Sequence, residues 1–203
     1  MIILSMKHSN IFKKIKARFP RKILNALRKN NNITSYHVEF IDQLSKFVNP
    51  SSYCEIGIYE AETFNRVCAN KKIAVDISEQ ALSYINMDSN TTKIKGNSSD
   101  LDLYLRKNNI LLDLVFIDAN HEKDHVIEDF ANVVSHVAKN GIVLLHDTFP
   151  ETREYTSQTL CGTAYLAISE LRMKYTDWSF VTIPIHPGLT IAIHNESAPL
   201  WVQ

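Results

Sequence analysis

From Ser52 onward, short apolar runs with β character alternate with stretches of helical periodicity. Five runs have the length of strands and lie at residues 53–56, 72–76, 92–95, 112–117 and 141–145. Helical stretches separate them, near residues 61–70, 79–86, 99–108 and 123–138. Because strands that alternate with helices pair in parallel, this order predicts an α/β fold with a doubly wound sheet and helices on both faces.

The last of these helices has the clearest apolar face, formed by Val126, Phe130, Val133, Val134 and Val137. We expect it to end at the sequence Lys-Asn-Gly of residues 139–141, which is typical of a helix C-terminus. A further helix is predicted over about 162–174. The runs 179–184 and 189–194 are joined by an Ile-His-Pro-Gly turn. They predict an antiparallel hairpin at one edge of a sheet that then has seven strands.

The N-terminal part differs from this body in charge and pattern. Residues 1–38 hold nine Lys or Arg and no acid, so the other 165 residues carry 13 bases against all 22 acids. We predict a basic helical arm over 1–48 and a second unit over 49–203. The arm contains a helix over 10–29, interrupted at Pro20, and a second over 35–47. An acidic body is not a nucleic-acid-binding domain.

Three roles for the arm remain open at this stage: a lid or dimer contact beside the functional site, a solvated surface, or a weak contact with a membrane surface. A homodimer would follow from the first. No apolar run reaches the roughly 18 residues of a membrane span. The first four residues are too few for the apolar part of a secretion signal, and the three cysteines form no CxxC pair. These features predict a cytoplasmic protein with reduced thiols.

Ligands of open α/β sheets bind beyond the carboxyl ends of the strands. The first strand runs into YCEIGIYEAET, where Gly57 allows a tight turn and a close approach of a ligand. Asp76 ends the second strand, 21 residues after Glu55, and can accept hydrogen bonds from both hydroxyls of a ribose. Its alternative role is that of a solvated loop acid. After the third strand, in KIKGNSSD, Asn97 or Ser98 could face an adenine ring.

The fourth and fifth strands end in isolated acids, Asp118 and Asp147. Carboxylates at the rim of a buried sheet need water, a cation or another partner, and a hard divalent ion such as Mg²⁺ would satisfy them. His146 as a direct ligand would favour Mn²⁺, Fe²⁺ or Zn²⁺ instead. His121 could act as a general base, or it could cap a helix or bond to Asp118. His146 could be a second base, a ligand or a core residue.

Three segments carry a resemblance to a known family. YCEIGIYEAET resembles the first motif of class I S-adenosylmethionine-dependent methyltransferases, E/D-x-G-x-x-x-G-x-S/T, which Glu55, Gly57 and Thr63 match while Ala61 replaces the second glycine. DLVFIDANHEKDH (113–125) and GIVLLHDT (141–148) resemble the pattern hhFIDG-x-H and GGhhhhHDT of the macrocin O-methyltransferase and cephalosporin-hydroxylase-like subgroup, the methyltransferase domain 24 type. Ala119 and Asn140 stand where that pattern has glycine.

The resemblance implies a Rossmann-like fold, S-adenosylmethionine as cofactor and a divalent metal, Mg²⁺ or Mn²⁺. It implies cofactor contacts from Glu55, Gly57, Thr63, Asp76, Ile77, Asn97, Ser98 and Asp118. By similarity to catechol O-methyltransferase, it implies metal ligands among Asp118, His146 and Asp147. The place of His121 and His146 beside these acids predicts catalytic roles for both.

The expected reaction is methyl transfer to a hydroxyl of a small molecule, a sugar or a phenol. Two alternatives stay open. One is a metal-free methyltransferase with His121 as base. The other is a catalytically silent nucleotide-binding regulatory protein, which the loss of glycine at Ala61, Ala119 and Asn140 would fit. An NAD-linked oxidoreductase is disfavoured because the segment after the first strand lacks GxGxxG.

Overall fold

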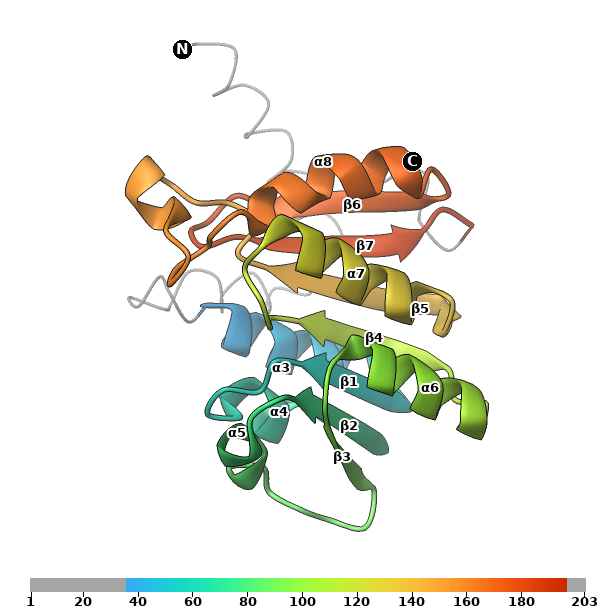
Figure 1. The fold of residues 1–203 in the computed structure, drawn as a ribbon. Coiled ribbons are helices and arrows are strands. Elements are labelled where there is room, and N and C mark those ends of the chain that lie inside the picture. The colour runs from blue at the N-terminus through green and yellow to red at the C-terminus, as the bar shows by residue number, and fades with distance from the viewer. Residues whose placement is uncertain (1–35, 197–203) are drawn as a thin grey trace.

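The computed structural model describes residues 36–196 (Figure 1). The predicted helix over 10–29, with most of the predicted arm, lies outside the described residues. The helices are α3 (Tyr36–Val48), α4 (Glu62–Arg66), α5 (Glu79–Ser83), α6 (Ser98–Asn108), α7 (Lys123–Val134) and α8 (Ala164–Lys174), with a 3₁₀ turn η2 (Arg153–Thr156). The strands are β1 (Ser52–Ile56), β2 (Lys71–Asp76), β3 (Thr91–Lys95), β4 (Leu112–Ile117), β5 (Val137–His146), β6 (Trp178–Ile183) and β7 (Leu189–His194).

The seven strands form one sheet in the order β3-β2-β1-β4-β5-β7-β6. Strands β1 to β5 pair in parallel, whereas β7 is antiparallel to both β5 and β6. This confirms the predicted α/β class with a C-terminal antiparallel hairpin. The chain runs outward from β1 to β3, then returns to β4 beside β1 and runs outward the other way. The order of strands therefore reverses between β1 and β4, the place where such sheets bind ligands.

Two apolar cores lie on opposite faces of the sheet. Helices α6, α7 and α8 cover one face, and α3, α4 and α5 cover the other (Figure 1). Alternation along β4 supplies both cores, since Val115 and Ile117 belong to the first and Leu114 and Phe116 to the second. Strands buried on both faces explain why the sequence shows continuous apolar runs.

Helix α3 is the described part of the predicted arm, and it packs into the second core. Its side chains Phe40, Ile41 and Leu44 are buried there. They recur at the spacing of one helical face, which is why the segment forms an amphipathic helix. None of the helices within residues 36–196 has the length and apolar character that a membrane span requires.

The end of α7 differs from the prediction. The helix stops at Val134, and β5 already begins at Val137, which pairs with Leu112. Farther along, Leu114 pairs with Ile142, so β5 contains an irregularity that absorbs the extra residues. Gly141 belongs to this irregularity, where a Cβ would lie 2.4 Å from a methyl carbon of Val137. Strand pairing with β4 thus overrides the helical periodicity, and the Asn-Gly pair shapes a bulge instead of a helix end.

Candidate functional site

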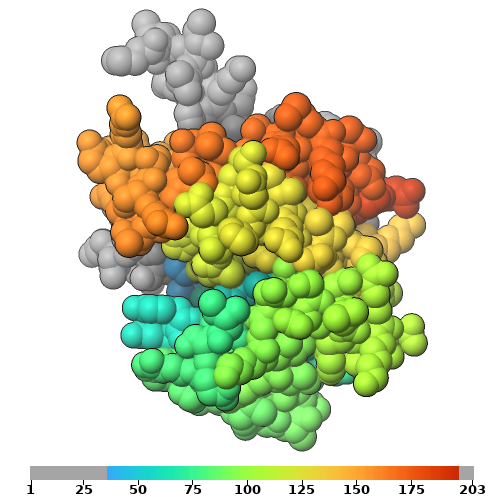
Figure 2. Space-filling view, viewed as in Figure 1, coloured from blue at the N-terminus to red at the C-terminus, as the bar shows by residue number. Residues whose placement is uncertain are grey.

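A cleft of about 1350 Å³ lies at the carboxyl ends of the parallel strands. Its lining includes the four acids that end strands or follow them: Glu55, Asp76, Asp118 and Asp147. The remaining residues predicted for the site also line it, namely Gly57, Thr63, Ile77, Asn97, Ser98, His121 and His146. The segments that follow β1 (cyan) and β5 (orange) reach the same edge of the molecule (Figure 2). The fold therefore brings every predicted site residue to one hollow.

The turn after β1 depends on two residues with positive φ. Gly57 has φ 89°, and a Cβ there would lie 2.2 Å from the carbonyl oxygen of Asp118. Ala61 has φ 58° and donates its N–H to the carbonyl of Ile58 at 2.8 Å. Ala61 thus adopts a backbone conformation that glycine reaches more easily, at the motif position where glycine is usual. The conformation of the turn is kept although the second glycine is not.

Glu55 is a buried carboxylate at the floor of this turn, with 2% of its surface exposed. Its carboxylate accepts a hydrogen bond from the hydroxyl of Tyr53. Burial raises the pKa of Glu55 well above its usual range, and the charge of Asp118 adds to this effect. Burial likewise raises the pKa of the Tyr53 hydroxyl, so that this group remains a proton donor. The site therefore holds a carboxyl whose charge is costly in the absence of a cationic partner.

Asp76, which was predicted to bind a ribose, has a structural role that the sequence did not indicate. One carboxylate oxygen accepts from the backbone N–H of Ile58 at 2.7 Å, and the other accepts from that of Ser78 at 2.7 Å. Each oxygen can accept a further hydrogen bond. Asp76 therefore ties the turn after β1 to the end of β2 and keeps acceptor capacity toward the cleft. Ile77 beside it is 77% exposed.

Asn97 and Ser98 begin α6. The side chain of Asn97 accepts from the backbone N–H of Ser99 at 3.0 Å and of Asp100 at 3.3 Å, and forms a capping box with Asp100. The hydroxyl of Ser98 accepts a hydrogen bond from Asn132 at 2.9 Å. These contacts stabilise the helix terminus and join α6 to α7. Both side chains thus have partners within the fold beside the cleft.

His146, the last residue of β5, lies between Asp118, which follows β4, and Asp147, which follows β5. Nδ1 of His146 is 3.0 Å from Oδ1 of Asp118 and 3.4 Å from Oδ2 of Asp147. Burial alone would lower the pKa of His146, but the two carboxylates reverse this and raise it to about 10. Burial would raise the pKa of Asp118, whereas His146 lowers it to about 2. Without a bound cation, the imidazolium of His146 therefore compensates these carboxylates.

His121 approaches the same acids from the segment after β4. Its Nε2 lies 3.1 Å from Oδ2 of Asp147 and 3.9 Å from Oδ1 of Asp118. The carbonyl of His121 accepts the backbone N–H of Thr163 at 2.8 Å, which fixes this segment against the start of α8. Asp118, His121 and Asp147 each offer one ligand atom, all within 4.8 Å of one another. The predicted metal acids are thus adjacent, with His121 as the third member of this group.

The sequence interpretation missed His37 on α3. The ring of His37 lies 4.1 Å from the ring of His146, centroid to centroid, and stacks on Phe116 at 5.9 Å. His37, Asp118 and His146 form a second group whose ligand atoms lie within 4.8 Å of one another. A signal was present, because His37 precedes Phe40, Ile41 and Leu44 at the spacing of the same helical face. A titratable side chain in line with a buried face points toward the interior.

Cys161 lies in the stretch after β5 and lines the cleft together with Thr159 and Leu160. Burial raises the pKa of its thiol to about 12, and the carboxylate of Asp147 contributes. A thiol held protonated is a poor nucleophile, so Cys161 is not an activated nucleophile. Cys54 is also buried, and burial is the main cause of the raised pKa of its thiol.

Solved structures share this fold. An O-methyltransferase from Bacillus cereus in complex with S-adenosylhomocysteine superimposes with a TM-score of 0.66 at 13% identity, covering 87% of this chain and 91% of the other. Methyltransferase PaMTH1 from Podospora anserina, also bound to S-adenosylhomocysteine, gives 0.63 at 14% identity, with 87% and 88% covered. The O-methyltransferase TomG from Streptomyces achromogenes, with S-adenosylmethionine, gives 0.62 at 13%, with 87% and 91% covered.

No curated protein matches the sequence significantly. A family model does match it, and that model describes a methyltransferase domain. The match spans residues 21–148, more than half of the chain, and includes β1 to β5 with the acids at their carboxyl ends. The strand order, the cleft at its reversal point and this match agree, and the chain belongs to the methyltransferase domain family.

Proposed function

We propose that this protein is an S-adenosylmethionine-dependent O-methyltransferase that methylates a hydroxyl of a small molecule, a sugar or a phenol, with the help of a divalent metal ion. The observation that carries this proposal is the convergence of Glu55, Asp76, Asp118 and Asp147 on one cleft at the reversal of strand order. Four further acids line the same cleft, namely Glu60, Glu62, Glu128 and Asp129. A cleft with this many carboxylates favours a cationic ligand, and S-adenosylmethionine carries an ammonium and a sulfonium group.

The cofactor contacts follow from the acids near β1 and β2. The buried carboxyl of Glu55 lies below the turn that Gly57 closes, and it would accept hydrogen bonds from the ammonium group of the methionine part. Asp76 still has acceptor capacity and would bind the ribose hydroxyls. Ile77 is exposed at the cleft and offers an apolar surface to the adenine ring. Thr63 and the start of α6 complete the predicted contacts.

The part of the cleft beside Asp118 and Asp147 has the ligand types of a divalent metal site. Asp118 and Asp147 supply oxygen and His121 supplies nitrogen, and one ligand atom of each lies within 4.8 Å of the others. Carboxylates and imidazole are ligands that Mn²⁺ and similar ions accept, and carboxylates alone suit Mg²⁺. When bound, the ion would lower the pKa of an acceptor hydroxyl. His146 contacts both acids and is a further candidate ligand of the ion.

Methyl transfer is a displacement at the methyl carbon. The bond from sulfur to carbon breaks, its electron pair stays on sulfur, and a bond from the acceptor oxygen to carbon forms. The acceptor proton must leave: it passes to water when the metal ion holds His121, and in a site without the ion it passes to His121. Its Nε2 lies 3.1 Å from Asp147, whose negative charge stabilises the imidazolium that results. Orienting the two reactants lowers the activation barrier of such reactions, by up to roughly 7–11 kcal/mol in well-oriented systems.

Calorimetric titration with S-adenosylhomocysteine tests the proposal, with NAD as the comparison ligand. We expect saturable heat with S-adenosylhomocysteine and none with NAD. The Glu55→Gln variant should weaken the first interaction, whereas Asp124→Asn, at an exposed position outside the cleft lining, should leave it nearly unchanged. If millimolar S-adenosylhomocysteine gives no heat with the full-length protein, the proposal is wrong.

A metal-free methyltransferase with His121 as base is the second candidate. The short contact between His121 and Asp147 favours it, because a carboxylate in that place orients the ring of a general base. Turnover measured with and without EDTA separates the two candidates. Activity that survives complete removal of divalent ions and is lost in His121→Gln supports the metal-free form. The predictions of a homodimer, of a cytoplasmic location and of a role for the basic arm stay predictions.

A further inference from the structure

Three imidazoles and two carboxylates meet at the metal end of the cleft. His37 of α3 and His146 of β5 group with Asp118, and His121 from the segment after β4 groups with Asp118 and Asp147. We infer that His37 is a metal ligand of this protein and that the site binds a transition ion such as Fe²⁺, Co²⁺ or Zn²⁺ in preference to Mg²⁺. This inference rests on the proposed function only in that it concerns the metal of that site.

The geometry that carries the inference is the group of His37, Asp118 and His146. One nitrogen of each histidine and one oxygen of Asp118 lie within 4.8 Å of one another. The two rings are 4.1 Å apart, centroid to centroid, and tilted by 57°, so they do not stack flat. Two imidazoles with one carboxylate form a donor set that is typical of Fe²⁺ and related ions.

His146 supplies an independent observation. Only 9% of its side chain is exposed, and within residues 36–196 its Nε2 is buried and has no hydrogen-bond partner. A buried polar nitrogen that lacks a partner costs free energy, which a bound ion would recover. Leu144, two residues earlier on β5, packs into the core that α3 covers, so alternation along the strand turns His146 to the same face. This face is the one from which His37 approaches.

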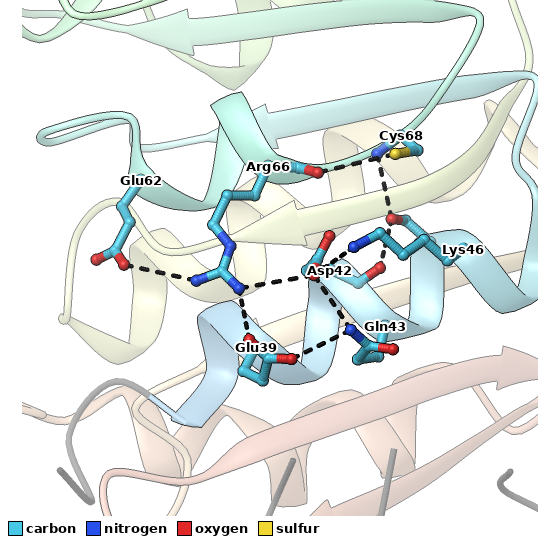
Figure 3. Close-up of polar contacts among 8 residues, drawn as sticks. Glu39, Asp42, Gln43, Lys46, Glu62, Arg66 and Cys68 are labelled. Carbon is cyan, nitrogen blue, oxygen red and sulfur yellow. Dashed lines mark hydrogen bonds and ion pairs between the residues drawn. The ribbon is translucent and has the colours of Figure 1, made fainter. Parts of the chain in front are cut away.

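Helix α3 is firmly attached, so that His37 has a defined position. Its buried side chains Phe40 and Ile41 hold it to the sheet. On the outer side, Arg66 of α4 makes ion pairs with Glu39 and with Asp42 at 3.6 Å (Figure 3). Asp42 also pairs with Lys46 at 2.8 Å. A ligand on a rigid helix keeps its geometry when the ion binds, which favours affinity.

The preference for a transition ion follows from the ligand types. Mg²⁺ takes oxygen ligands in near-octahedral geometry and binds imidazole poorly. Affinity for nitrogen-containing sites rises through Fe²⁺ and Co²⁺ toward Cu²⁺, and Zn²⁺ also binds imidazole well. A site in which His37 and His146 join Asp118 therefore discriminates against Mg²⁺, whereas a site built from Asp118 and Asp147 alone would not.

The experiment uses Co²⁺ as the probe, because its visible absorption reports ligand number and type. Metal-stripped, full-length protein is titrated with Co²⁺ in the presence of a large excess of Mg²⁺. We expect Co²⁺ to bind despite the Mg²⁺. His37→Phe keeps the aromatic packing on Phe116 but removes the nitrogen donors, and it should weaken Co²⁺ binding at least about tenfold and change the absorption spectrum. His125→Phe is the control, since His125 lines the same cleft outside both ligand groups.

The inference is overturned if His37→Phe binds Co²⁺ as tightly as His125→Phe does, or if equal concentrations of Mg²⁺ displace Co²⁺ from the wild type. Circular dichroism and thermal unfolding establish that each variant is folded, and His37→Gln takes the place of His37→Phe if the latter is not. Titration of the metal-free wild type with S-adenosylhomocysteine is run in parallel. Absence of that binding contradicts the proposed function, whereas the Co²⁺ titrations alone decide the role of His37.

Discussion

Nδ1 of His146 lies 3.0 Å from Oδ1 of Asp118, although 28 positions separate the two residues in the chain. The contact follows from the parallel pairing of β4 with β5, in which Ile117 is opposite Leu145. The residue after Ile117 is Asp118 and the residue after Leu145 is His146, so these two side chains meet at the ends of the strands. Asp147 follows His146 with φ 58°, which bends the chain back so that its carboxylate faces the same place. The site is therefore a product of sheet register.

The carboxylate of Asp147 should be required for metal binding but not for cofactor binding. Asp147→Asn keeps a residue that tolerates positive φ, so the backbone should be unchanged. Loss of the charge should weaken divalent-ion binding by roughly 10- to 100-fold, while the affinity for S-adenosylhomocysteine stays the same. Metal titration and calorimetry measure the two quantities. Asp124→Asn, at an exposed position on α7, is the control, and equal metal affinity in both variants would contradict the assignment.

Glu55 should make the unliganded protein less stable as the pH rises. Because burial raises its pKa in the folded state, its contribution to stability is fully present below the ordinary value of 4.5 and is lost as the pH rises through the folded pKa. Glu55→Gln has no proton to lose and still accepts from Tyr53. Its free energy of unfolding should therefore fall less than that of the wild type between about pH 5 and about pH 8.

Urea unfolding at the two pH values measures this difference, and the exposed Glu60→Gln variant should follow the wild type. A parallel pH dependence in Glu55→Gln and wild type would show that Glu55 is not the group responsible. The same variant should gain stability at the higher pH while it loses cofactor affinity, as is common where a functional site holds a costly charge.

The two positive-φ positions after β1 should differ in their sensitivity to substitution. Gly57→Ala would place a Cβ 2.2 Å from the carbonyl oxygen of Asp118 and should destabilise the protein by about 3 kcal/mol or more. Ala61→Gly relieves a left-handed alanine but removes a buried methyl group, and these effects of about 1 kcal/mol nearly cancel. Thermal and urea unfolding compare the two variants. A Gly57→Ala variant as stable as the wild type would contradict the close approach of the turn after β1 to the end of β4.

The polar cluster between α3 and α4 should stabilise the fold through the buried carboxylate of Asp42. Replacing both Arg66 and Lys46 by Met leaves this carboxylate without its two cationic partners, and we expect a loss of about 2 kcal/mol. Lys95→Met removes an ion pair with Glu79 in which both side chains are mostly exposed, and should change stability by less than about 0.5 kcal/mol. Urea unfolding measures the loss of stability in both variants. Equal losses would show that the cluster between α3 and α4 has no special role in stability.

The order of strands and helices and the hairpin could be predicted from sequence because each depends on apolar periodicity within a few neighbouring residues. The acids at the strand ends could be found for the same reason, since an isolated Asp after a buried apolar run marks the end of a strand. Helix α7 shows where this reasoning fails. Val137 continues the apolar face of the helix, yet it pairs with Leu112 in the sheet.

The sequence by itself determined which side chains arrive at the carboxyl edge of the sheet, because strand length and alternation are local properties. Only the tertiary structure decided what those side chains contact. It turned both oxygens of Asp76 to backbone N–H groups, placed His146 between two carboxylates and brought His37 from α3 over the same site. These contacts join segments far apart in the chain, and they depend on register and helix packing, which periodicity within one segment does not encode.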